Sequence, residues 1–539
     1  MTGLINRLDR STGRSPYTPL NHRRILCVFP RYSRSFGTFE HSYPLMGNVR
    51  AFMPPQGILV VAAYLPATWE VRFIDENVRV AKPADYRWAD AVIVSGMHIQ
   101  RPQIQHINEQ AHRFGKITAL GGPSVSGCPE YYPDLDLLHL GELGDATDRM
   151  IEHLDLHTER PQGQIRFETQ ERLPLDQFPV PAYELVNLKN YFLANVQYSS
   201  GCPYRCEFCD IPELYGSNPR LKTPEQVVAE LDAMLRSGNP GAVYFVDDNF
   251  VGNRRAAIEL LPHLIDWQKR NGYPIQFACE ATLNIAQSPQ LLAMMREAYF
   301  CTVFCGIETP ERDALHAISK DQNLSMPILD AIKVLNSYGM EVVSGIIMGL
   351  DTDTPETGER LLEFIRLSQI PMLTINLLHA LPRTPLWRRL EKEGRLSQDE
   401  GRESNVQFLM PYEQVLEMWR RCITTAYDPE FLYERFAYNQ QHTYPNRIAV
   451  PNSPQRASWA NIRKGLTIMS NVLLRIGLLG PYRETFWKMA KPALRSGNIE
   501  TLIHIALVGH HLITFARECA EGTESAAFYS QKLQAQKAT

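Results

Sequence analysis

The chain has 539 residues, of which 44% are hydrophobic and 21% are charged, and its net charge is −4 at pH 7. This length exceeds what one hydrophobic core usually serves and favours roughly two to four domains. The lack of a basic excess argues against a nucleic-acid partner. No uninterrupted apolar run is long enough for a membrane span, and residues 1–22, expected to be flexible, contain no apolar signal-peptide core.

The ten cysteines are few for this length, and most stand singly in apolar runs, as Cys27 does in "RRILCVFP". Buried and reduced thiols of this kind are typical of proteins in a reducing compartment. We therefore expect a cytoplasmic protein.

Residues 23–160 alternate short β-branched runs with stretches of helical spacing at 56–66 and 101–115. Continuous apolar runs separated by helices indicate a parallel sheet that is covered on both faces. The expected strands are 23–30, 69–76, 89–97, 116–122 and 135–142.

The carboxyl ends of such strands form the edge at which ligands bind. Glycines at this edge would let a large ligand approach the backbone closely, although they could equally do no more than terminate the strands. The sequence has no GxGxxG motif after the first strand, which argues against a nicotinamide or flavin dinucleotide. The candidate binding residues are Asp75, Ser95, Gly121, Gly122, Gly141 and Glu142.

A proline-bearing linker over 161–189 leads to a second strand–helix alternation over 190–390. Thr223, Pro224 and Gln226 give a capping-box signal for one of its helices. Repeated βα units with right-handed crossovers make an incomplete β/α barrel, with the chemistry at the carboxyl ends of the strands. The expected strands are 192–199, 242–249, 275–282, 302–309, 341–350 and 372–382.

The first barrel strand runs into "SSGCPYRCEFCDIP", which places Cys202, Cys206 and Cys209 in one loop on the catalytic face. A structural zinc site needs four ligands, and disulfides need an even number of cysteines. Three thiolates suit a [4Fe–4S] cluster that leaves one iron open to an exogenous ligand. A zinc knuckle completed by Asp210 or by a distant cysteine is the alternative.

The C-x3-C-x2-C spacing, with Phe208 before the last cysteine, resembles the signature of the radical S-adenosylmethionine (SAM) superfamily. The resemblance implies that SAM chelates the open iron. It also implies that Asp247 or Asp248 receives the SAM amino group, and that Glu280 and Glu308 lie near the ribose. Each carboxylate could instead simply cap the end of its strand. Because side chains alternate along a strand, only one of the two aspartates is expected to face the barrel interior.

The first domain resembles the cobalamin-binding Rossmann-like domain. Many members carry a D-x-H-x-x-G motif whose histidine binds cobalt, and this chain lacks that motif. His98 follows the third strand, and we do not expect it to bind cobalt. A cobalt without a histidine ligand would suit methyl transfer, because the axial ligand tunes the metal.

A cobalamin domain followed by a radical SAM barrel is the arrangement of the cobalamin-dependent radical SAM family. The resemblance implies a [4Fe–4S] cluster, SAM and methylcobalamin as cofactors, and an electron donor of the flavodoxin or ferredoxin type. It implies a C-methyltransferase that acts on an unactivated sp3 carbon. One SAM would supply the radical, and a second SAM would supply the methyl group through cobalt.

Within this family the chain is most similar to the bacterial hopanoid C-2 methylases, through "RILCVFPRYSRSFGTFEHSYPLMGNVRAFMPPQGILVVAAYLP" and "CPYRCEFCDIPELYG". The resemblance implies a hopanoid substrate methylated at C-2 of the A ring. Arg383 in "LHALPRTPLW" stands where many relatives have glycine. Enzymes with the same two domains that methylate other carbons, or that form a tetrapyrrole ring, remain alternatives, as does a non-enzymatic electron relay. A tRNA methylthiotransferase would need a second cysteine triad, and the first domain offers only Cys27 and Cys128.

The C-terminal part, 391–519, is expected to be helical and to precede a flexible tail over 520–539. Two of the expected helices cover 459–480 and 500–519, and the second is apolar almost all round. Helices of that kind are buried or contact lipid, and core packing is the commoner case. Because a hydrocarbon substrate would need an apolar lid and access from the bilayer, a peripheral contact with the inner face of the membrane is also expected.

Overall fold

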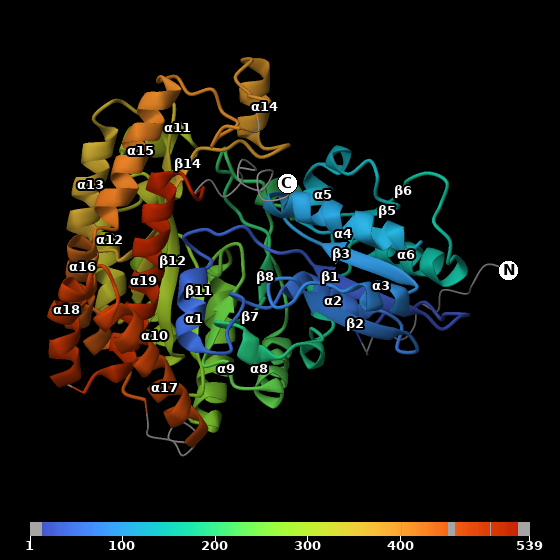
Figure 1. Cartoon of the computed structure of the whole chain (residues 1–539), viewed down its shortest axis with the longest axis horizontal. Helices are drawn as coiled ribbons and strands as arrows, with labels where there is room; N and C mark the ends of the chain where they lie inside the picture. The colour runs from blue at the N-terminus through green and yellow to red at the C-terminus, as the bar shows by residue number, and fades with distance from the viewer. Residues whose placement is uncertain (1–12, 400, 451–458, 496, 526–539) are drawn as a thin grey trace.

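The computed structural model describes residues 13–399, 401–450, 459–495 and 497–525. Figure 1 shows an N-terminal α/β domain in blue and cyan, a central set of parallel strands in green and yellow, and a layer of helices in orange and red. This architecture confirms the expected fold class: a Rossmann-like domain, a partial β/α barrel and a helical C-terminal domain.

The N-terminal domain contains a six-stranded parallel sheet in the order β2-β1-β3-β4-β5-β6. The sequence did not indicate β6, which lies inside the expected linker, because Ile165 and Phe167 are its only apolar residues. A four-residue strand is too short to show a hydrophobic period. The strands are β1 (Arg24–Phe29), β2 (Glu70–Asp75), β3 (Ala91–Ser95), β4 (Ile117–Gly121), β5 (Leu137–Leu140) and β6 (Ile165–Glu168).

Helices cover both faces of this sheet, so that its central strands are almost fully buried between two apolar clusters. The apolar side chains of α2 and α6 enter one cluster, and those of α3, α4 and α5 enter the other. The helices are α2 (Gln56–Tyr64), α3 (Pro83–Trp88), α4 (Arg101–Arg113), α5 (Pro123–Gly127) and α6 (Asp145–Leu156).

Residues 13–22 are bound to the N-terminal domain rather than flexible as expected. The Asp155 carboxylate, which is completely buried, accepts hydrogen bonds from the Tyr17 hydroxyl (2.9 Å) and from the amide of Leu20 (2.7 Å). A buried carboxylate requires such donors, and this requirement fixes the segment. Residues 1–12 lie outside the described part of the chain.

The central domain contains six parallel strands in the order β14-β13-β12-β11-β10-β7, so each crossover moves to the adjacent position and generates an incomplete barrel. The predicted capping box begins α8, where the Thr223 amide donates to Gln226 Oε1 (2.8 Å). The strands are β7 (Ala194–Val196), β10 (Ala242–Phe245), β11 (Gln276–Glu280), β12 (Phe300–Glu308), β13 (Glu341–Met348) and β14 (Met372–Leu377).

Helices cover the outside of the barrel, and short elements complete its catalytic face. The principal helices are α8 (Pro224–Ser237), α9 (Arg254–Asn271), α10 (Pro289–Glu297), α12 (Ile328–Ser337) and α13 (Thr357–Ser368). The short elements are β8 (Ser199–Ser200), α7 (Ile211–Leu214), β9 (Arg220–Leu221) and α11 (Arg312–Ala317).

The C-terminal domain packs its helices against the barrel and against α1 (Tyr43–Met46). By length and composition α19 could cross a membrane, but 61% of its apolar window is buried inside the protein, as expected of a core helix. The helices are α14 (Pro385–Lys392), α15 (Tyr412–Ala426), α16 (Pro429–His442), α17 (Trp459–Val472), the π-helix η10 (Leu473–Leu478), α18 (Arg483–Arg495) and α19 (Ile499–Glu521). The first part of the expected tail is ordered as far as Ser525: Glu524 pairs with Arg34, and Ser525 donates to Glu403, while 526–539 lie outside the described residues.

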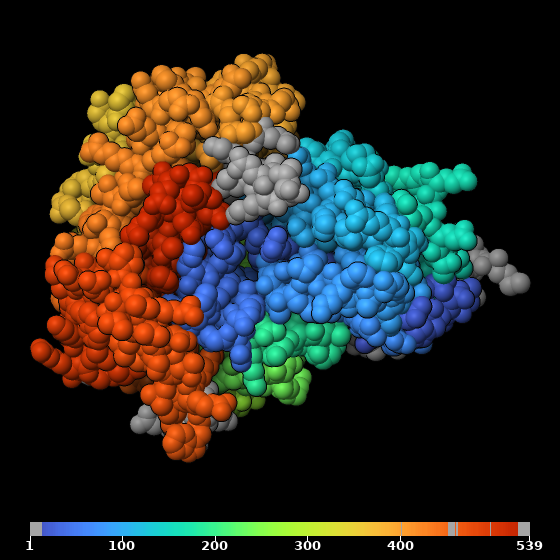
Figure 2. Space-filling view, in the orientation of Figure 1, coloured from blue at the N-terminus to red at the C-terminus, as the bar shows by residue number. Residues whose placement is uncertain are grey.

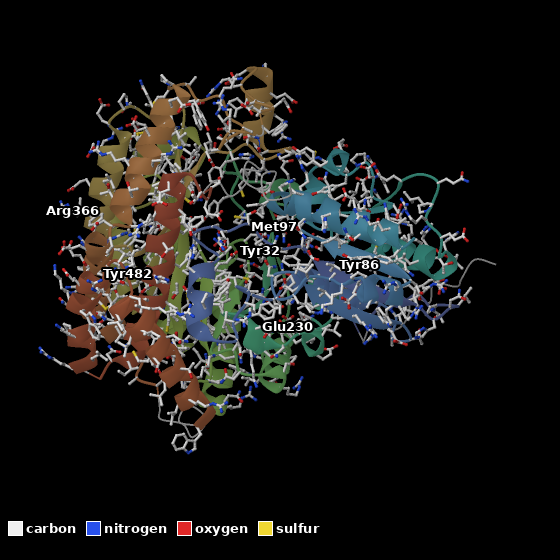
Figure 3. The ribbon with its side chains drawn as sticks, in the orientation of Figure 1. Tyr32, Tyr86, Met97, Glu230, Arg366 and Tyr482 are labelled. Carbon is white, nitrogen blue, oxygen red and sulfur yellow. The ribbon has the colours of Figure 1, made fainter. Side chains whose placement is uncertain are left out.

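A buried ion pair joins Lys222, the residue after β9, to Glu230 of α8 and yields a stability prediction. Lys222 Nζ donates to Glu230, both side chains are almost completely buried, and Gln56 of the N-terminal domain also donates to Glu230 (3.4 Å; Glu230 is labelled in Figure 3). Lys222→Met alone should lower the free energy of unfolding by about 3–5 kcal/mol, because it leaves a buried carboxylate without its cation. The double variant Lys222→Met/Glu230→Leu should be less destabilised than the single variant. Urea denaturation measures both, and equal losses in the two variants would contradict the pairing.

Candidate active site

The ligand-binding edge of the N-terminal sheet faces the barrel. Glu142, directly after β5, accepts hydrogen bonds from Ser200 (3.2 Å) and Arg220 (2.5 Å) beside the cysteine loop. Arg383, beyond β14, donates to the carbonyl of Ser126 in α5 (3.1 Å). In Figure 3, the labels of Tyr32 and Met97 mark the junction of the two domains. The carboxyl ends of the strands in the two domains, where the cofactors are expected to bind, therefore meet at one interface.

The cysteine loop is held by backbone contacts on several sides. Gly201 has a φ of +97°, and a Cβ there would lie 2.8 Å from the carbonyl oxygen of Gly216, so a side chain would not fit. The amide of Cys202 donates to that same carbonyl (3.2 Å). The carboxylate of Glu207 receives two guanidinium nitrogens of Arg389 at 2.5 and 3.1 Å, a bidentate pair that links the loop to α14.

The three thiols are partly or fully buried, and burial raises the pKa of Cys202 and of Cys209. Gln322 Nε2 lies 3.3 Å from Cys206 Sγ, where it can donate to a thiolate. In the described residues no three His, Cys, Asp or Glu side chains converge as they would on a single metal ion. In a [4Fe–4S] cluster each cysteine binds its own iron, so the sulfur atoms need not converge on one point. The donor set therefore fits a three-thiolate cluster better than a zinc knuckle.

The two consecutive aspartates after β10 point to different sides. Asp247 is 1% exposed and accepts hydrogen bonds from the amides of Tyr198 and Ser199, so it fixes the strand that enters the cysteine loop. Asp248 is less buried and accepts from the amide of Gly201 (2.7 Å). Along β10 and β11 the fully buried residues alternate with partly exposed ones, and Asp248 and Glu280 belong to the partly exposed series that faces the barrel interior.

Three carboxyl groups lie close enough to repel one another. Burial, together with repulsion from neighbouring carboxylates, raises the pKa of Asp247 to about 7, of Asp248 to about 6 and of Glu280 to about 8. The Tyr244 hydroxyl is 3.5 Å from Glu280 Oε1. A cationic ligand in the barrel would stabilise the ionised forms of these carboxylates.

Glu308 does not face an open site. Its carboxylate accepts a hydrogen bond from Lys320 Nζ, and its backbone has a φ of +65°, which is strained for a residue with a side chain. Lys320 Nζ also lies 5.5 Å from the centre of the Phe208 ring. Glu308 therefore acts on the site by holding a lysine next to the cysteine loop.

Arg220 is a site residue that the sequence did not indicate. It donates to Glu142 and to Ser200 (3.0 Å), while its Nε and Nη1 atoms are buried without a hydrogen-bond partner in the described part of the chain. Buried guanidinium donors need an acceptor, and a ligand carboxylate would satisfy them. No sequence motif marks this arginine, because it comes from β9, outside the strand ends of the barrel.

The glycine-bearing loops of the N-terminal sheet approach one another closely. Gly122 has a φ of +97°, and a Cβ there would lie 2.7 Å from Ser95 Oγ. Gly121 lies directly before it, and the amide of Gly141 is joined to α5 through Ser126 Oγ (2.9 Å). The small residues at these strand ends therefore let the loops pack closely and keep the backbone within reach of a ligand.

Asp75 and Glu142 have different surroundings from the other candidates at this edge. Asp75 is 4% exposed, accepts from the Tyr191 hydroxyl (3.1 Å) at the domain junction, and has a pKa raised by burial to about 6. Glu142 is occupied by Arg220 and Ser200. Both carboxylates link the two domains.

Two histidines, His98 and His379, lie close enough at this junction to influence each other electrostatically. His98 Nδ1 lies 3.1 Å from Ser124 Oγ, and a Cβ on Gly127 would come within 3.1 Å of His98 Nε2, so both ring nitrogens are packed against α5. Burial lowers the pKa of His98 to about 4 and that of His379, just beyond β14, to about 3, so both rings are neutral at pH 7. No sequence motif marks His379.

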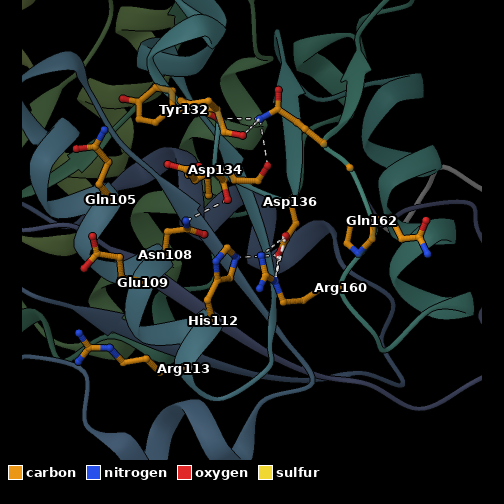
Figure 4. A pocket seen from close by; sticks show the side chains of 15 residues that line it. Gln105, Asn108, Glu109, His112, Arg113, Tyr132, Asp134, Asp136, Arg160 and Gln162 are labelled. Atoms are coloured by element: carbon orange, nitrogen blue, oxygen red, sulfur yellow. Dashed lines mark hydrogen bonds and ion pairs between the residues drawn. The ribbon is translucent and has the colours of Figure 1, made fainter.

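A large pocket lies elsewhere in the N-terminal domain (Figure 4). It has a volume of about 950 Å³ and lies at the amino-terminal edge of β5, opposite the ligand edge. His112 Nε2 is 3.0 Å from Asp136, and Arg160 pairs with the same carboxylate at 3.1 Å. Because these polar side chains pair with one another and lie at the edge opposite the cysteine loop, we assign them a structural role.

Family models match three consecutive parts of the chain. A B12 binding domain matches residues 44–150, the radical SAM superfamily matches 196–365, and a domain of unknown function, DUF4070, matches 384–525. The order of the first two models agrees with the order of the two parallel sheets. These two matches support a [4Fe–4S] cluster, SAM and cobalamin as the cofactors.

Known proteins resemble the chain over nearly its whole length. Hopanoid C-2 methylase of Rhodopseudomonas palustris (strain TIE-1) is 60% identical over 511 residues, which cover 95% of this chain and 97% of the relative. An uncharacterized methyltransferase of Synechocystis sp. is 33% identical, with 90% of each chain covered. The structure of the radical SAM methyltransferase TsrM from Kitasatospora setae, with cobalamin and a [4Fe–4S] cluster bound, has the same fold, with a TM-score of 0.58 at 14% identity over 93% of this chain and 100% of that one. The chain thus belongs to the cobalamin-dependent radical SAM family, and it is a radical SAM C-methyltransferase.

Proposed function

We propose that this enzyme methylates C-2 of the A ring of a hopanoid. The observation that carries the proposal is the 60% identity to hopanoid C-2 methylase over 95% of the chain. A saturated ring carbon has no lone pair and no acidic proton, so a polar methyl transfer cannot reach it. When bound, the cluster with SAM supplies hydrogen abstraction by a 5'-deoxyadenosyl radical, and cobalamin supplies the methyl group.

Cys202, Cys206 and Cys209 are the proposed cluster ligands. Gln322 would stabilise the thiolate of Cys206 through its hydrogen bond, and Lys320 would offset negative charge near the loop, where Glu308 holds it. Such neighbours tune an iron–sulfur centre without binding iron.

SAM is proposed to lie over the barrel interior beside the cysteine loop. Asp248 and Glu280, on the inner face, are suited to the amino and ribose groups, and the free donors of Arg220 are suited to the carboxylate. Phe208 lines the same loop. Asp247 and Glu308 are proposed to position the site, since each is bound within the protein.

Cobalamin is proposed to bind the cradle formed by Ser95, Gly121, Gly122 and Gly141. Asp75 and Glu142 would then orient the cradle against the barrel, because their contacts cross the domain junction. We further propose that a flavodoxin or ferredoxin reduces the cluster, and that the enzyme works at the inner face of the membrane, where a lipid substrate is available.

The cluster assignment predicts a selective loss of iron. Anaerobically reconstituted enzyme should bind about four irons and four sulfides. Cys202→Ala, Cys206→Ala or Cys209→Ala should abolish this cluster and 5'-deoxyadenosine formation, as measured by iron analysis, electron paramagnetic resonance and chromatography. The buried Cys301 and Cys305 serve as controls, and their alanine variants should keep both. A cluster that depends on this second pair would make the assignment wrong.

The packing of His98 predicts a cobalamin without this residue on cobalt. His98→Ala should retain cobalamin and leave the electron paramagnetic resonance spectrum of its Co(II) form unchanged, because both ring nitrogens are packed against α5. The disappearance of a nitrogen splitting in this variant would show that His98 is a ligand.

The substrate is tested by expression in a bacterium that makes only unmethylated hopanoids. The wild-type gene should add one methyl group at C-2 and transfer deuterium from methyl-labelled methionine, as detected by mass spectrometry of the lipids. Cys202→Ala is the matched control and should add none. Unchanged hopanoids, despite full cluster and cobalamin loading, would reject the substrate and leave the methyltransferase chemistry intact.

A further inference from the structure

The segment Trp459–Leu479, which comprises α17 and η10, exposes a row of large apolar side chains. Of the thirteen exposed large hydrophobic residues in the described part of the chain, six lie in these 21 positions, and they are 42% to 82% exposed. On the opposite side of the segment, Ile468, Val472 and Ile476 are at most 6% exposed. The six residues, which we call the apolar stripe, are Trp459, Ile462, Leu466, Leu474, Leu478 and Leu479.

Helical geometry keeps the stripe continuous. Trp459, Ile462 and Leu466 are separated by three and four residues, as on one face of an α-helix. The π-helical turn of η10 has a wider repeat, which keeps Leu478 on the side of Leu474. Helix α18 fixes this turn, because Trp487 Nε1 donates to the carbonyl of Gly477 (2.8 Å). The exposed leucines are therefore presented by a rigid element.

The region of the stripe is strongly basic, whereas the whole chain carries a net charge of −4. Glu484 is the single acidic residue in the sequence between positions 459 and 495. The seven basic residues in this range are Arg463, Lys464, Arg475, Arg483, Lys488, Lys491 and Arg495, of which Lys488 pairs with Glu430 of α16 (2.9 Å). Exposed apolar side chains flanked by basic ones complement an anionic lipid surface, where the apolar groups enter the acyl region and the cations meet the headgroups.

A pocket of about 460 Å³ lies between η10 and the N-terminal domain, and Arg475, the neighbour of Leu474, is the residue of η10 that lines it. The rest of the lining combines Tyr32, Val49 and Phe52 with charged residues, among them Arg34 and Glu40. In Figure 1, α17 lies at the lower edge of the helical domain, and Figure 2 shows this orange surface exposed.

We propose that the apolar stripe and its basic residues dock the enzyme on an anionic lipid bilayer. The inference rests on the proposed function for the choice of a bilayer over a protein partner, because a hopanoid resides in a membrane. The docking element is α17–η10, and α19, which has the composition of a membrane span, serves as a core helix.

Vesicle flotation of the full-length protein tests the docking. Wild-type protein should float with vesicles that contain phosphatidylglycerol, bind phosphatidylcholine vesicles more weakly, and lose binding as salt rises. Leu466→Asn/Leu474→Asn/Leu478→Asn should weaken binding by about 100-fold, because three leucines no longer enter the bilayer. Arg463→Gln/Arg475→Gln should weaken binding to anionic vesicles by about 25-fold, since each lost cation accounts for roughly a fivefold loss. Binding to neutral vesicles should not change.

Matched controls come from exposed leucines elsewhere. Leu156, Leu367 and Leu409 are 50%, 48% and 65% exposed, and their combined change to asparagine should leave flotation unchanged. Wild-type protein that stays free of anionic vesicles would overturn the proposal, as would a stripe variant that floats as well as the wild type. A wild-type dimer that the stripe variant converts to a monomer would also overturn it, by assigning the stripe to a second copy of the chain.

Activity assays separate this inference from the proposed function. The stripe variant should methylate hopanoid in detergent like the wild type, but lose methylation of hopanoid embedded in vesicles. If wild-type protein floats with anionic vesicles but methylates no hopanoid in either form, the substrate is wrong and the docking surface stands. If it methylates hopanoid in detergent without floating, the docking surface is wrong and the substrate stands.

Discussion

The carboxylate of Glu142 is the contact on which the arrangement of the active site depends. It ends a strand of the cobalamin-binding domain and accepts hydrogen bonds from Ser200 and Arg220 on either side of the cysteine loop, and Arg172 pairs with it at 3.2 Å. A carboxylate that is mostly buried needs such cations to offset its desolvation. The contact therefore fixes the distance between the two cofactor edges, which radical methyl transfer requires to be short and constant.

The chain between β1 and α2 extends this constraint to the C-terminal helices. It leaves the N-terminal sheet, pairs with the start of the barrel through Ala51 and Tyr191, and packs Phe36 against Phe515 of α19 with ring centres 4.9 Å apart. Ser42 donates to the carbonyl of Leu507 (2.6 Å). One segment thus contacts all three domains, so the helices that cover the barrel are positioned by the domain that binds cobalamin.

The barrel interior combines acidic groups with a few placed cations. Asp248 and Glu280 repel each other, and burial raises the pKa of both carboxyls. Lys320 and Arg220 lie at the margin of this acidic region, each paired with a glutamate. SAM carries a sulfonium, an ammonium and a carboxylate. Such a ligand complements a site that contains both acidic and basic side chains better than a neutral molecule does.

The sequence by itself determined the fold class, the three-cysteine loop and the two parallel sheets, because strand periods, glycines and ligand spacing are local properties of the chain. It did not reveal β6, Arg220 or His379, and although it predicted that only one of Asp247 and Asp248 faces the barrel interior, it did not show which. These features depend on which segments meet across the domain junction and on which side of a strand is covered, and such contacts join residues far apart in the chain. Tertiary packing also decided which C-terminal helix exposes apolar side chains. Composition made α19 a candidate for lipid contact, but packing buries α19 and leaves one apolar face of α17 exposed.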